Sequence, residues 1–266
     1  MTWRIVATEE VVAQLRALGV REGAVLVVHT AYSRVGPVEG GPAGLIAALQ
    51  TAIGPRGTLV LPSMSDDDDV PFDGTRTSCR ALGITADTFW RLPGVLRSDN
   101  PLAFAARGPE AGAITAPHPL EVPHGLDSPP GRAYQRGGQI LLLGVGHDAN
   151  TTIHVAEAMA KVRYRARHHV TVLRDGRPVR IDYEETDHCC ERFALMDEWL
   201  EARGQPRGQQ RRGTVGNGEA RLCEARDVVA HAVAQLEREE TVFLHPPGVD
   251  DECDRARASL DGVAPG

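Results

Sequence analysis

Residues 139–143, QILLL, are the part of this chain that most restricts its fold. The run is too short and too uniformly apolar for a surface helix, so it predicts a strand that is buried on both faces of a sheet. A glycine turn at 144–146 ends the strand, and its backbone can approach a ligand closely. Apolar residues then recur at the helical period from 153 to 160, which predicts a helix capped by Asp148 or Asn150.

Helices and strands alternate along the rest of the chain as well. Helices are expected over residues 8–18, 41–53, 85–92, 191–202 and 224–236, with Thr8 and Thr85 as caps and Gly19 at the end of the first helix. Strands are expected over residues 24–29, 58–61, 169–173, 179–183 and 242–244, with a tight hairpin at Asp175-Gly176. These elements predict a mixed sheet with helices on both faces.

Two stretches lack the periodicity of a helix or a strand. Many prolines predict that residues 93–138 are mostly loop, and glycines among polar residues predict a connection over 204–218. The 266 residues suffice for one large α/β domain or two small ones. We expect a single domain over 1–266, with a flexible acidic tail from about 248 to 266.

The composition restricts the compartment and the partners. No segment approaches the roughly 18–20 apolar residues of a membrane span or has the pattern of a secretory signal, so we expect a cytoplasmic protein. The five cysteines are an odd number, which favours free thiols or a metal site over a disulfide framework. A net charge of −7 argues against a nucleic-acid phosphate backbone as partner and is compatible with a cationic one.

His154 lies one turn into the helix that follows the glycine turn, where it shares a face with Glu157 and Lys161. An isolated histidine on a helix is more often structural than catalytic. Thr151, however, lies three residues earlier on the same side, and a strand elsewhere ends in the carboxylates of 184–187. A carboxylate that bonds to a histidine fixes its tautomer and raises its basicity, which suits a general base near neutral pH.

The glycine turn fits a known cofactor motif only in part. Residues 144–149, GVGHDA, match the dinucleotide fingerprint between a strand and a helix. A Rossmann site would also need an acidic residue about 20 positions later, and that distance falls in the basic stretch 163–169. The turn is therefore better suited to another phosphate-bearing cofactor, with Gly146 as a candidate contact.

Two acidic segments are candidates for a binding site. Residues 66–69 are four consecutive aspartates, but the alternating ligands and central glycine of a calcium-binding EF-hand are absent. Such a run is often no more than a solvated loop. Together with residues 184–187, EETD, it can instead line an acidic cleft that concentrates cations, and a polyamine-like substrate fits such a cleft.

A zinc site is a further hypothesis. His188, Cys190 and Cys253 offer the nitrogen and sulfur ligands that zinc prefers. Residues 189–190 are equally compatible with two small buried cysteines at the start of a helix that bind no metal. The chain has no Cys-x-x-Cys pair, and Asp250 stands where a second thiolate would form one with Cys253.

Four motifs in chain order resemble those of the aminoglycoside 3-N-acetyltransferases, the antibiotic N-acetyltransferase family. They are residues 29–33 (HTAYS), 97–101 (RSDNP), 147–157 (HDANTTIHVAE) and 187–193 (DHCCERF). The last is similar to the motif of the subgroup that acts on apramycin and gentamicin. The resemblance implies a three-layer α/β/α fold, distinct from the common Gcn5-related acetyltransferases. It also implies acetyl-CoA as donor and the 3-amine of the 2-deoxystreptamine ring of an antibiotic as acceptor, hence resistance.

The resemblance further implies roles for individual residues. His154 would be the base, Glu185 its orienting partner and Thr151 a donor to the thioester oxygen. The ammonium groups of the aminoglycoside would be contacted by Asp68, Asp69, His124 and Asp187. The CoA would be contacted by Thr30, Ala31, Tyr32, Ser33, Val35, Gly36, Arg97, Ser98 and Gly146. In relatives of this subgroup a cysteine is expected near position 250, where this chain has Asp250.

Two other functions are compatible with parts of the sequence. A zinc-dependent amidohydrolase would use His188, Cys190 and Cys253, and a non-catalytic protein would merely bind cationic small molecules. A serine hydrolase is disfavoured because the chain has no Gly-x-Ser-x-Gly motif. Free CoA that appears only with an aminoglycoside would indicate the transferase, and inactivation by a chelator would indicate the hydrolase. We expect a monomer or a homodimer.

Overall fold

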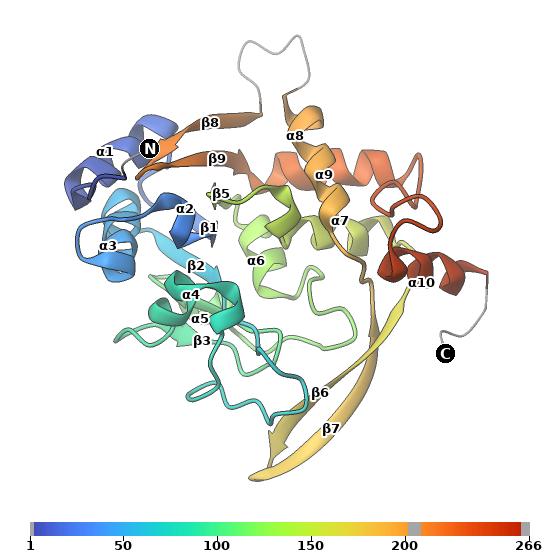
Figure 1. Ribbon diagram of the computed structural model, residues 1–266. Coiled ribbons are helices and arrows are strands. Elements are labelled where there is room, and N and C mark those ends of the chain that lie inside the picture. Colours follow the sequence, from blue (N-terminus) through green and yellow to red (C-terminus); the bar gives the residue numbers. More distant parts are fainter. Residues whose placement is uncertain (1–2, 202–208, 262–266) are drawn as a thin grey trace.

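A central sheet runs through the part of the chain that the computed structural model describes, residues 3–201 and 209–261 (Figure 1). Its strand order is β3-β4-β2-β1-β5-β9-β8. The strands span Val25–Thr30 (β1), Thr58–Pro62 (β2), Leu96–Arg97 (β3), Phe104–Arg107 (β4), Gln139–Leu143 (β5), Gln210–Val215 (β8) and Gly218–Glu224 (β9). Strand β1 pairs in parallel with β2 and β5, whereas the other neighbours pair antiparallel. The sheet is therefore mixed, as the sequence predicts.

The two central strands are buried on both faces. Every residue of β5 is buried, and Val28 of β1 lies opposite Leu141 in register. Ile140 and Leu142 pack into one apolar cluster, while Leu141 and Leu143 pack into another on the opposite face. Successive side chains of a strand point to opposite faces, so a strand covered on both sides reads as a continuous apolar run. The prediction of a buried strand is confirmed.

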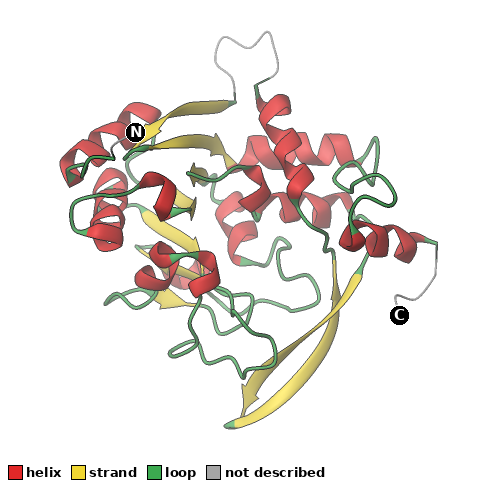
Figure 2. Cartoon of the chain, in the orientation of Figure 1, coloured by secondary structure: helices red, strands yellow, loops and turns green. Residues whose placement is uncertain are grey.

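Helices cover both faces of the sheet and complete three layers (Figures 1 and 2). One face carries α1 (Thr8–Leu18), α3 (Gly41–Ile53) and α4 (Ile84–Phe89). The other carries α5 (Ala111–Ile114), α6 (Pro129–Gln135), α7 (Thr152–Ala160), α8 (Leu195–Leu200), α9 (Ala225–Leu236) and α10 (Asp251–Leu260). The α/β/α architecture is thus confirmed. Among the described residues, no helix combines the length and the apolar character that a membrane crossing requires.

A two-stranded arm, β6 (Ala166–Arg174) and β7 (Arg177–Glu185), extends along the edge of the molecule (Figure 1). Asp175 and Gly176 join its strands with φ angles of 52° and 73°. Two left-handed residues give the turn a twist that matches the right-handed twist of a hairpin. The predicted hairpin is confirmed, although each strand is longer than expected. The backbone N–H of Phe72 donates to the Thr171 carbonyl at 2.9 Å and connects the arm to the loop after β2.

The proline-rich stretch 93–138 has more regular structure than predicted. It contains β3, β4, α5 and α6. Pro129 and Pro130 are the first residues of α6, where a missing N–H and a fixed φ are tolerated. The Ser128 hydroxyl caps this helix by accepting from the Gly131 N–H at 3.2 Å. Prolines that suggest a loop therefore begin a helix here.

The polar segment 204–218, expected to be a connection, contains strand β8 and the first residue of β9. Residues 210–224 form β8 and β9, which extend the sheet beyond β5, and residues 204–208 lie outside the described part. Strand β8 is at the edge, with residues 211–214 exposed, so it has no apolar periodicity to reveal it. The helix expected over 191–202 is divided into a 3-10 turn, Glu191–Ala194 (η3), and α8.

The C-terminal part differs from the prediction in two places. The strand expected over 242–244 is wrong, because these residues form a turn that buries Phe243. In the segment expected to be a flexible tail, α10 packs Cys253 into the core. Asp250 caps this helix by accepting from the Cys253 N–H at 2.8 Å. Acidic residues in a first turn favour a helix, so the acidity of this segment stabilises structure.

The predicted helix caps are only partly correct. Thr8 and Thr85 lie inside α1 and α4, not at their cap positions. Gly19 does end α1 in the left-handed conformation, with φ 106°. The cap position of α7 is Thr151 and not the predicted Asp148 or Asn150, although Asn150 accepts from the Thr152 N–H at 3.2 Å just before the helix.

Candidate active site

A cavity of about 510 Å³ opens at the carboxyl ends of the parallel strands β1, β2 and β5. Ligands of α/β proteins bind at this edge of the sheet, because the strand ends leave a crevice there. We call the cavity the strand-end pocket. Its lining residues are His29, Thr30, Ala31, Tyr32, Ser33, Pro62, Met64, Ala81, Leu82, Gly83, Ile84, Val145, Ala149 and Thr151.

Hydroxyl groups give the strand-end pocket much of its polarity. The hydroxyl of Thr30 is buried and has no hydrogen-bond partner within the described part of the chain. The hydroxyl of Thr151 lies 3.4 Å from Nε2 of His29. Burial lowers the pKa of His29 to about 4, so its ring is neutral near pH 7. Both hydroxyls are therefore available to a polar ligand that enters this pocket.

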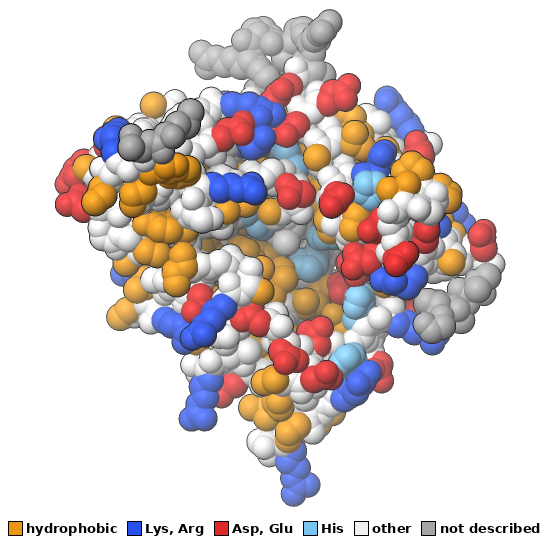
Figure 3. All heavy atoms as spheres, viewed as in Figure 1, with side chains coloured by type: hydrophobic (Ala, Val, Ile, Leu, Met, Phe, Trp, Pro, Cys, Tyr) orange, Lys and Arg blue, Asp and Glu red, His pale blue; other side chains and the backbone are white. Residues whose placement is uncertain are grey.

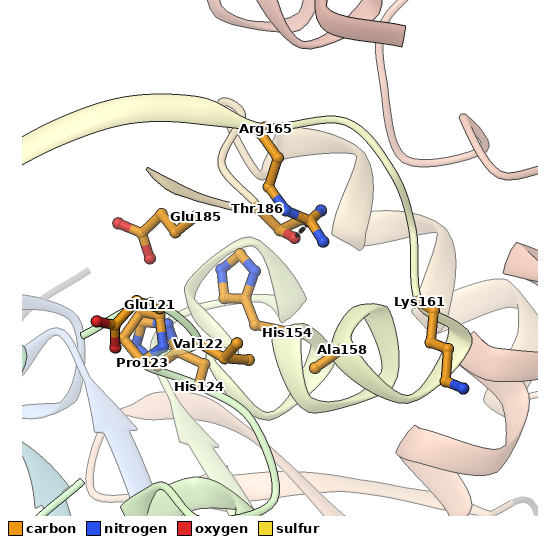
Figure 4. A pocket seen from close by; sticks show the side chains of 10 residues that line it. All are labelled: Glu121, Val122, Pro123, His124, His154, Ala158, Lys161, Arg165, Glu185 and Thr186. Carbon is orange, nitrogen blue, oxygen red and sulfur yellow. Dashed lines mark hydrogen bonds between the residues drawn. The ribbon is translucent and has the colours of Figure 1, made fainter. Parts of the chain in front are cut away.

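A second cavity, of about 130 Å³, lies beside α7 (Figure 4). We call it the histidine pocket. Its lining residues are Glu121, Val122, Pro123, His124, His154, Ala158, Lys161, Arg165, Glu185 and Thr186. In Figure 4 the ring of His154 projects from α7 toward Glu185 and Thr186, whereas Lys161 points away from it. The helix thus presents Thr151 to one pocket and His154, one turn later, to the other.

Two histidine rings stack in the histidine pocket. The ring centroids of His124 and His154 are 5.2 Å apart, with an interplanar angle of 28°. Burial lowers the pKa of His124 to about 3, so this ring is neutral. Its Nε2 is buried without a hydrogen-bond partner in the part of the chain that is described. His124 therefore leaves a polar atom for a ligand in this pocket.

The carboxylate that bonds to His154 is Glu157 and not the predicted Glu185. Nδ1 of His154 lies 2.6 Å from Oε2 of Glu157, three residues later on α7. Residues three apart on a helix are neighbours, which brings the two side chains together without any tertiary contact. Glu185 lines the same pocket, but its carboxylate accepts from the Tyr183 hydroxyl at 3.0 Å. The predicted pairing of His154 with Glu185 is therefore wrong.

Opposing effects set the pKa of His154. Burial lowers it, whereas Cys190 and Glu157 raise it, and the net pKa lies well above the ordinary value. Sγ of Cys190 lies 3.6 Å from Nε2 of His154. Because Nδ1 donates to Glu157, the neutral ring has its lone pair on Nε2. His154 thus has the tautomer and the basicity of a proton acceptor.

Each of the two acidic segments contacts a histidine of β6. Oδ2 of Asp187 lies 3.0 Å from Nε2 of His168, and Oδ1 of Asp69 lies 2.7 Å from Nε2 of His169. The hydrogen bond to Asp187 raises the pKa of His168, and the charge of the exposed Asp68 contributes in the same direction. Burial and the neighbouring Asp187 raise the pKa of Glu185 to about 7. Acidic side chains also gather around a central hollow in which histidines are visible (Figure 3).

The predicted CoA contacts divide into two groups. Thr30, Ala31, Tyr32 and Ser33 line the strand-end pocket, while Val35, Gly36, Arg97, Ser98 and Gly146 are not among its lining residues. The guanidinium of Arg97 donates to the carbonyl of Ser63 at 3.2 Å and lies over the rings of Phe72 and Trp90. The Ser98 hydroxyl accepts from the Phe104 N–H at 3.0 Å. Arg97 and Ser98 are therefore bound within the protein and stabilise loops.

The predicted zinc ligands do not come together. Nε2 of His188 bonds to Glu157 at 2.8 Å, Cys190 contacts His154, and Sγ of Cys253 lies 3.7 Å from Sγ of Cys189. The set of His188, Cys190 and Cys253 is thus wrong as a metal site. A different group fits a metal better. The ligand atoms of Cys189, Asp250 and Cys253 all lie within 4.8 Å of one another.

Sequence reasoning missed several residues of this site. Glu157 was recognisable only by its spacing of three from His154, which places both on one helix face. Tyr164 donates to the same carboxylate at 2.6 Å, but it follows the helix in an irregular segment with no motif. Residues 81–84 line the strand-end pocket from a distant part of the chain. Their contribution depends on tertiary packing, which the sequence does not reveal.

The site combines a pocket at the strand ends, a histidine paired with a carboxylate and acidic side chains nearby. Residues 27–237 match a family model described as aminoglycoside 3-N-acetyltransferase, and this chain belongs to that family. The enzyme transfers an acetyl group from acetyl-CoA to the 3-amine of aminoglycosides, a resistance activity. Membership of the family favours the transferase over an amidohydrolase or a non-catalytic binder.

The relatives cover nearly the whole chain. Aminoglycoside N(3)-acetyltransferase IV of a Salmonella species is 52% identical over 257 residues, which cover 96% of this chain and 97% of the relative. A mutant of aminoglycoside acetyltransferase AAC(3)-IVa, solved with a gentamicin, is 52% identical with a TM-score of 0.92 and covers 97% of this chain and 99% of its own. AAC-IIIb, solved with CoASH, is 30% identical with a TM-score of 0.80, and the coverages are 88% and 97%.

Proposed function

We propose that this enzyme acetylates gentamicin and apramycin, with His154 as its general base. The observation that carries the proposal is the position of α7. Thr151 at the start of this helix lines the strand-end pocket, and His154 lines the histidine pocket one turn later. An acetyl group in the first pocket and an amine in the second would meet at the helix, so one element can act on both substrates.

The pairing of His154 with Glu157 supports a direct transfer. Nε2 of neutral His154 takes the proton as the 3-amine attacks the thioester carbon. The Thr151 hydroxyl, 3.4 Å from His29, donates to the thioester oxygen as that oxygen gains negative charge. The carbon–sulfur bond then breaks, and the CoA thiolate takes up a proton from the imidazolium. The products are the acetylated amine and CoA, and His154 returns to its neutral form.

Charge supports the antibiotic site. Aminoglycosides carry several ammonium groups, and a cleft with carboxylates of one sign concentrates such cations. We assign their recognition to Asp68, Asp69 and Asp187, with Glu185 beside the base. His124 supplies a further contact, because its unpartnered Nε2 is buried in the pocket where the amine would lie. Nucleic acid is disfavoured as a partner by the net charge of −7.

The strand-end pocket is the proposed site of the acetyl-CoA arm. Thr30, Ala31, Tyr32 and Ser33 contribute to its lining from the end of β1, and residues 81–84 contribute from a later part of the chain. Thr151, which is one turn from the base, lines the same pocket. This supports a thioester delivered to His154 from the edge of the sheet. Because the donor is a cytosolic metabolite, we infer a cytoplasmic enzyme.

A structural zinc ion is a second proposal. The thiols of Cys189 and Cys253 and the carboxylate of Asp250 lie close enough to share one ion. Such an ion would connect α10 to the loop that carries Cys190, without touching the reacting atoms. Elemental analysis of the purified enzyme, with Cys253→Ser as the control, tests it. About one zinc per chain that is lost in the variant supports the site, and a metal-free wild-type protein excludes it.

The decisive experiment is a thiol-release assay with acetyl-CoA over a panel of aminoglycosides, followed by NMR of the product. We expect free CoA only when an aminoglycoside is present, and an acetyl group on the 3-amine of gentamicin and apramycin. Release without an acceptor, or acetylation elsewhere, would contradict the proposal. Sedimentation at the assay concentration would distinguish a monomer from a homodimer.

A further inference from the structure

Glu157 is the centre of a buried network that includes more than the base. Its side chain has no exposed surface and accepts three hydrogen bonds. Oε2 accepts from Nδ1 of His154 at 2.6 Å. Oε1 accepts from the Tyr164 hydroxyl at 2.6 Å and from Nε2 of His188 at 2.8 Å. A buried carboxylate is costly unless it is fully hydrogen-bonded, so these three donors are what keeps Glu157 ionised.

The geometry also fixes where the protons of the donors are. The backbone N–H of Cys190 donates to Nδ1 of His188 at 3.2 Å, so that nitrogen is an acceptor and the ring proton is on Nε2. The Tyr164 hydroxyl faces a carboxylate, and burial together with Glu157 raises its pKa, so it remains a donor at any working pH. Both groups therefore donate permanently to Oε1 of Glu157.

We propose that Tyr164 and His188 are positioning residues that act through Glu157 to set the proton affinity of His154. Their two hydrogen bonds draw electron density from the carboxylate and compete with its attraction for the imidazolium. With all its donors in place, Glu157 orients the ring of His154 without holding its proton too strongly. A base works best when its pKa lies near the operating pH, which is what this competition favours.

The network also links the base to the hairpin. Tyr164 lies just before β6 and His188 lies just after β7, so both ends of the arm are bonded to one carboxylate on α7. Other titratable groups also face the base or the carboxylate from neighbouring elements. These are Cys190 before η3, His124 in the loop before α6, Glu185 at the end of β7 and Asp187 just after it. None of them contacts Oε1 of Glu157. The loss of a hydrogen bond to that oxygen therefore reports on Tyr164 or His188.

The test is an NMR titration of the His154 ring in the free, full-length enzyme. Tyr164→Phe removes one donor and keeps the buried ring, so the pKa of His154 should rise by roughly 0.5 to 1 unit. His188→Leu should act in the same direction, whereas His188→Gln keeps an N–H donor and should restore most of the wild-type value. Tyr134→Phe is the matched control and should change nothing, because Tyr134 on α6 is not among the three hydrogen-bond donors to Glu157.

The kinetic counterpart is the pH profile of kcat/KM. In Tyr164→Phe its midpoint should move to higher pH by the same amount, with a several-fold loss at low pH, a plateau within about two-fold and an unchanged KM for acetyl-CoA. An equal loss at every pH, or a pKa of His154 that is unchanged or lower, would overturn the inference. This arm rests on the proposed role of His154, but the NMR arm does not. If His154→Ala stays active while the titration shifts as expected, the proposed base is wrong and the network inference stands.

Discussion

Nε2 of His154 is the atom that must take the proton, because Nδ1 already donates to Glu157. His154→Ala removes that atom, so we expect kcat to fall at least about 100-fold, the lower end for the loss of a general base. Thiol release at saturating acetyl-CoA and gentamicin measures it. His231→Ala on α9 serves as the control and should keep near wild-type activity. A near-normal kcat for His154→Ala would contradict the assignment.

The charge of Glu157 leads to a second prediction, on pH dependence. A raised pKa means that His154 is protonated at low pH, and only the neutral ring accepts a proton, so kcat/KM should rise with pH through a midpoint above 6.5. Glu157→Gln removes the charge that stabilises the imidazolium. Its midpoint should therefore lie at lower pH, with a reduced plateau because the ring is held less firmly.

The control for this prediction is Glu185→Gln. Glu185 bonds to Tyr183 and not to His154, so its removal should change the KM for the aminoglycoside more than the midpoint. A profile that is flat from about pH 5.5 to 9 in the wild type would refute the role of His154. A midpoint that moves with Glu185→Gln and not with Glu157→Gln would return the orienting role to Glu185.

The choice between Glu157 and Glu185 shows what a sequence can and cannot supply at a single site. His154 was predictable because it follows a buried strand and a glycine turn, and its motif resembles the family. Its partner was not, since a carboxylate three residues away and one at the end of a distant strand are equally plausible from sequence. The structure decides between them by distance, at 2.6 Å for Glu157.

Among the secondary-structure elements, the β6–β7 hairpin carries the acidic residues to the site. Asp187 follows β7 and pairs with His168 on β6 at 3.0 Å. Asp187→Asn keeps the shape and removes the charge, so the KM for the aminoglycoside should rise about five-fold, roughly 1 kcal/mol, with an unchanged KM for acetyl-CoA. Asp182→Asn, further along β7 and paired with Arg180, is the matched control and should have little effect. Equal changes in both KM values would remove Asp187 from the antibiotic site.

The elements differ in how far they could be predicted, and the difference follows their burial. Strand β5 and the central part of β1 are apolar because both faces are covered, so their sequences mark them clearly. Strand β8 is an edge strand with four exposed residues, and its arginines and glycine resemble a loop. Helix α6 begins with Pro129 and Pro130, which act as breakers inside a helix but fit its first turn. Local composition does not predict an element whose formation depends on a neighbour in the tertiary structure.

At the scale of the whole molecule, α7 lies where the two proposed substrate sites meet. The sheet supplies one site through the ends of three parallel strands, and the hairpin supplies the acidic part of the other. The histidines needed for this arrangement are buried, so the chemistry has a cost in stability. Buried neutral histidines must be protonated when the chain unfolds in acid.

That cost gives the last prediction, on stability against pH. Burial lowers the pKa of His29 and His118 to about 4 and that of His124 to about 3. Between pH 6.5 and about 4 the unfolded chain therefore binds three protons that the folded chain does not. Glu185, whose pKa is raised to about 7, binds one proton only when folded, so these four groups give a difference of three minus one near pH 5. Burial also lowers the pKa of His147, which adds to the difference in the same direction. Stability should thus fall on acidification, by about 1–2 kcal/mol per pH unit after a reduction for partial exposure.

Urea unfolding at pH 7 and pH 5 measures this fall in stability. His118 lines neither pocket, and His118→Gln should lessen the fall. Equal stability at the two pH values would mean that these histidines are protonated in the folded enzyme.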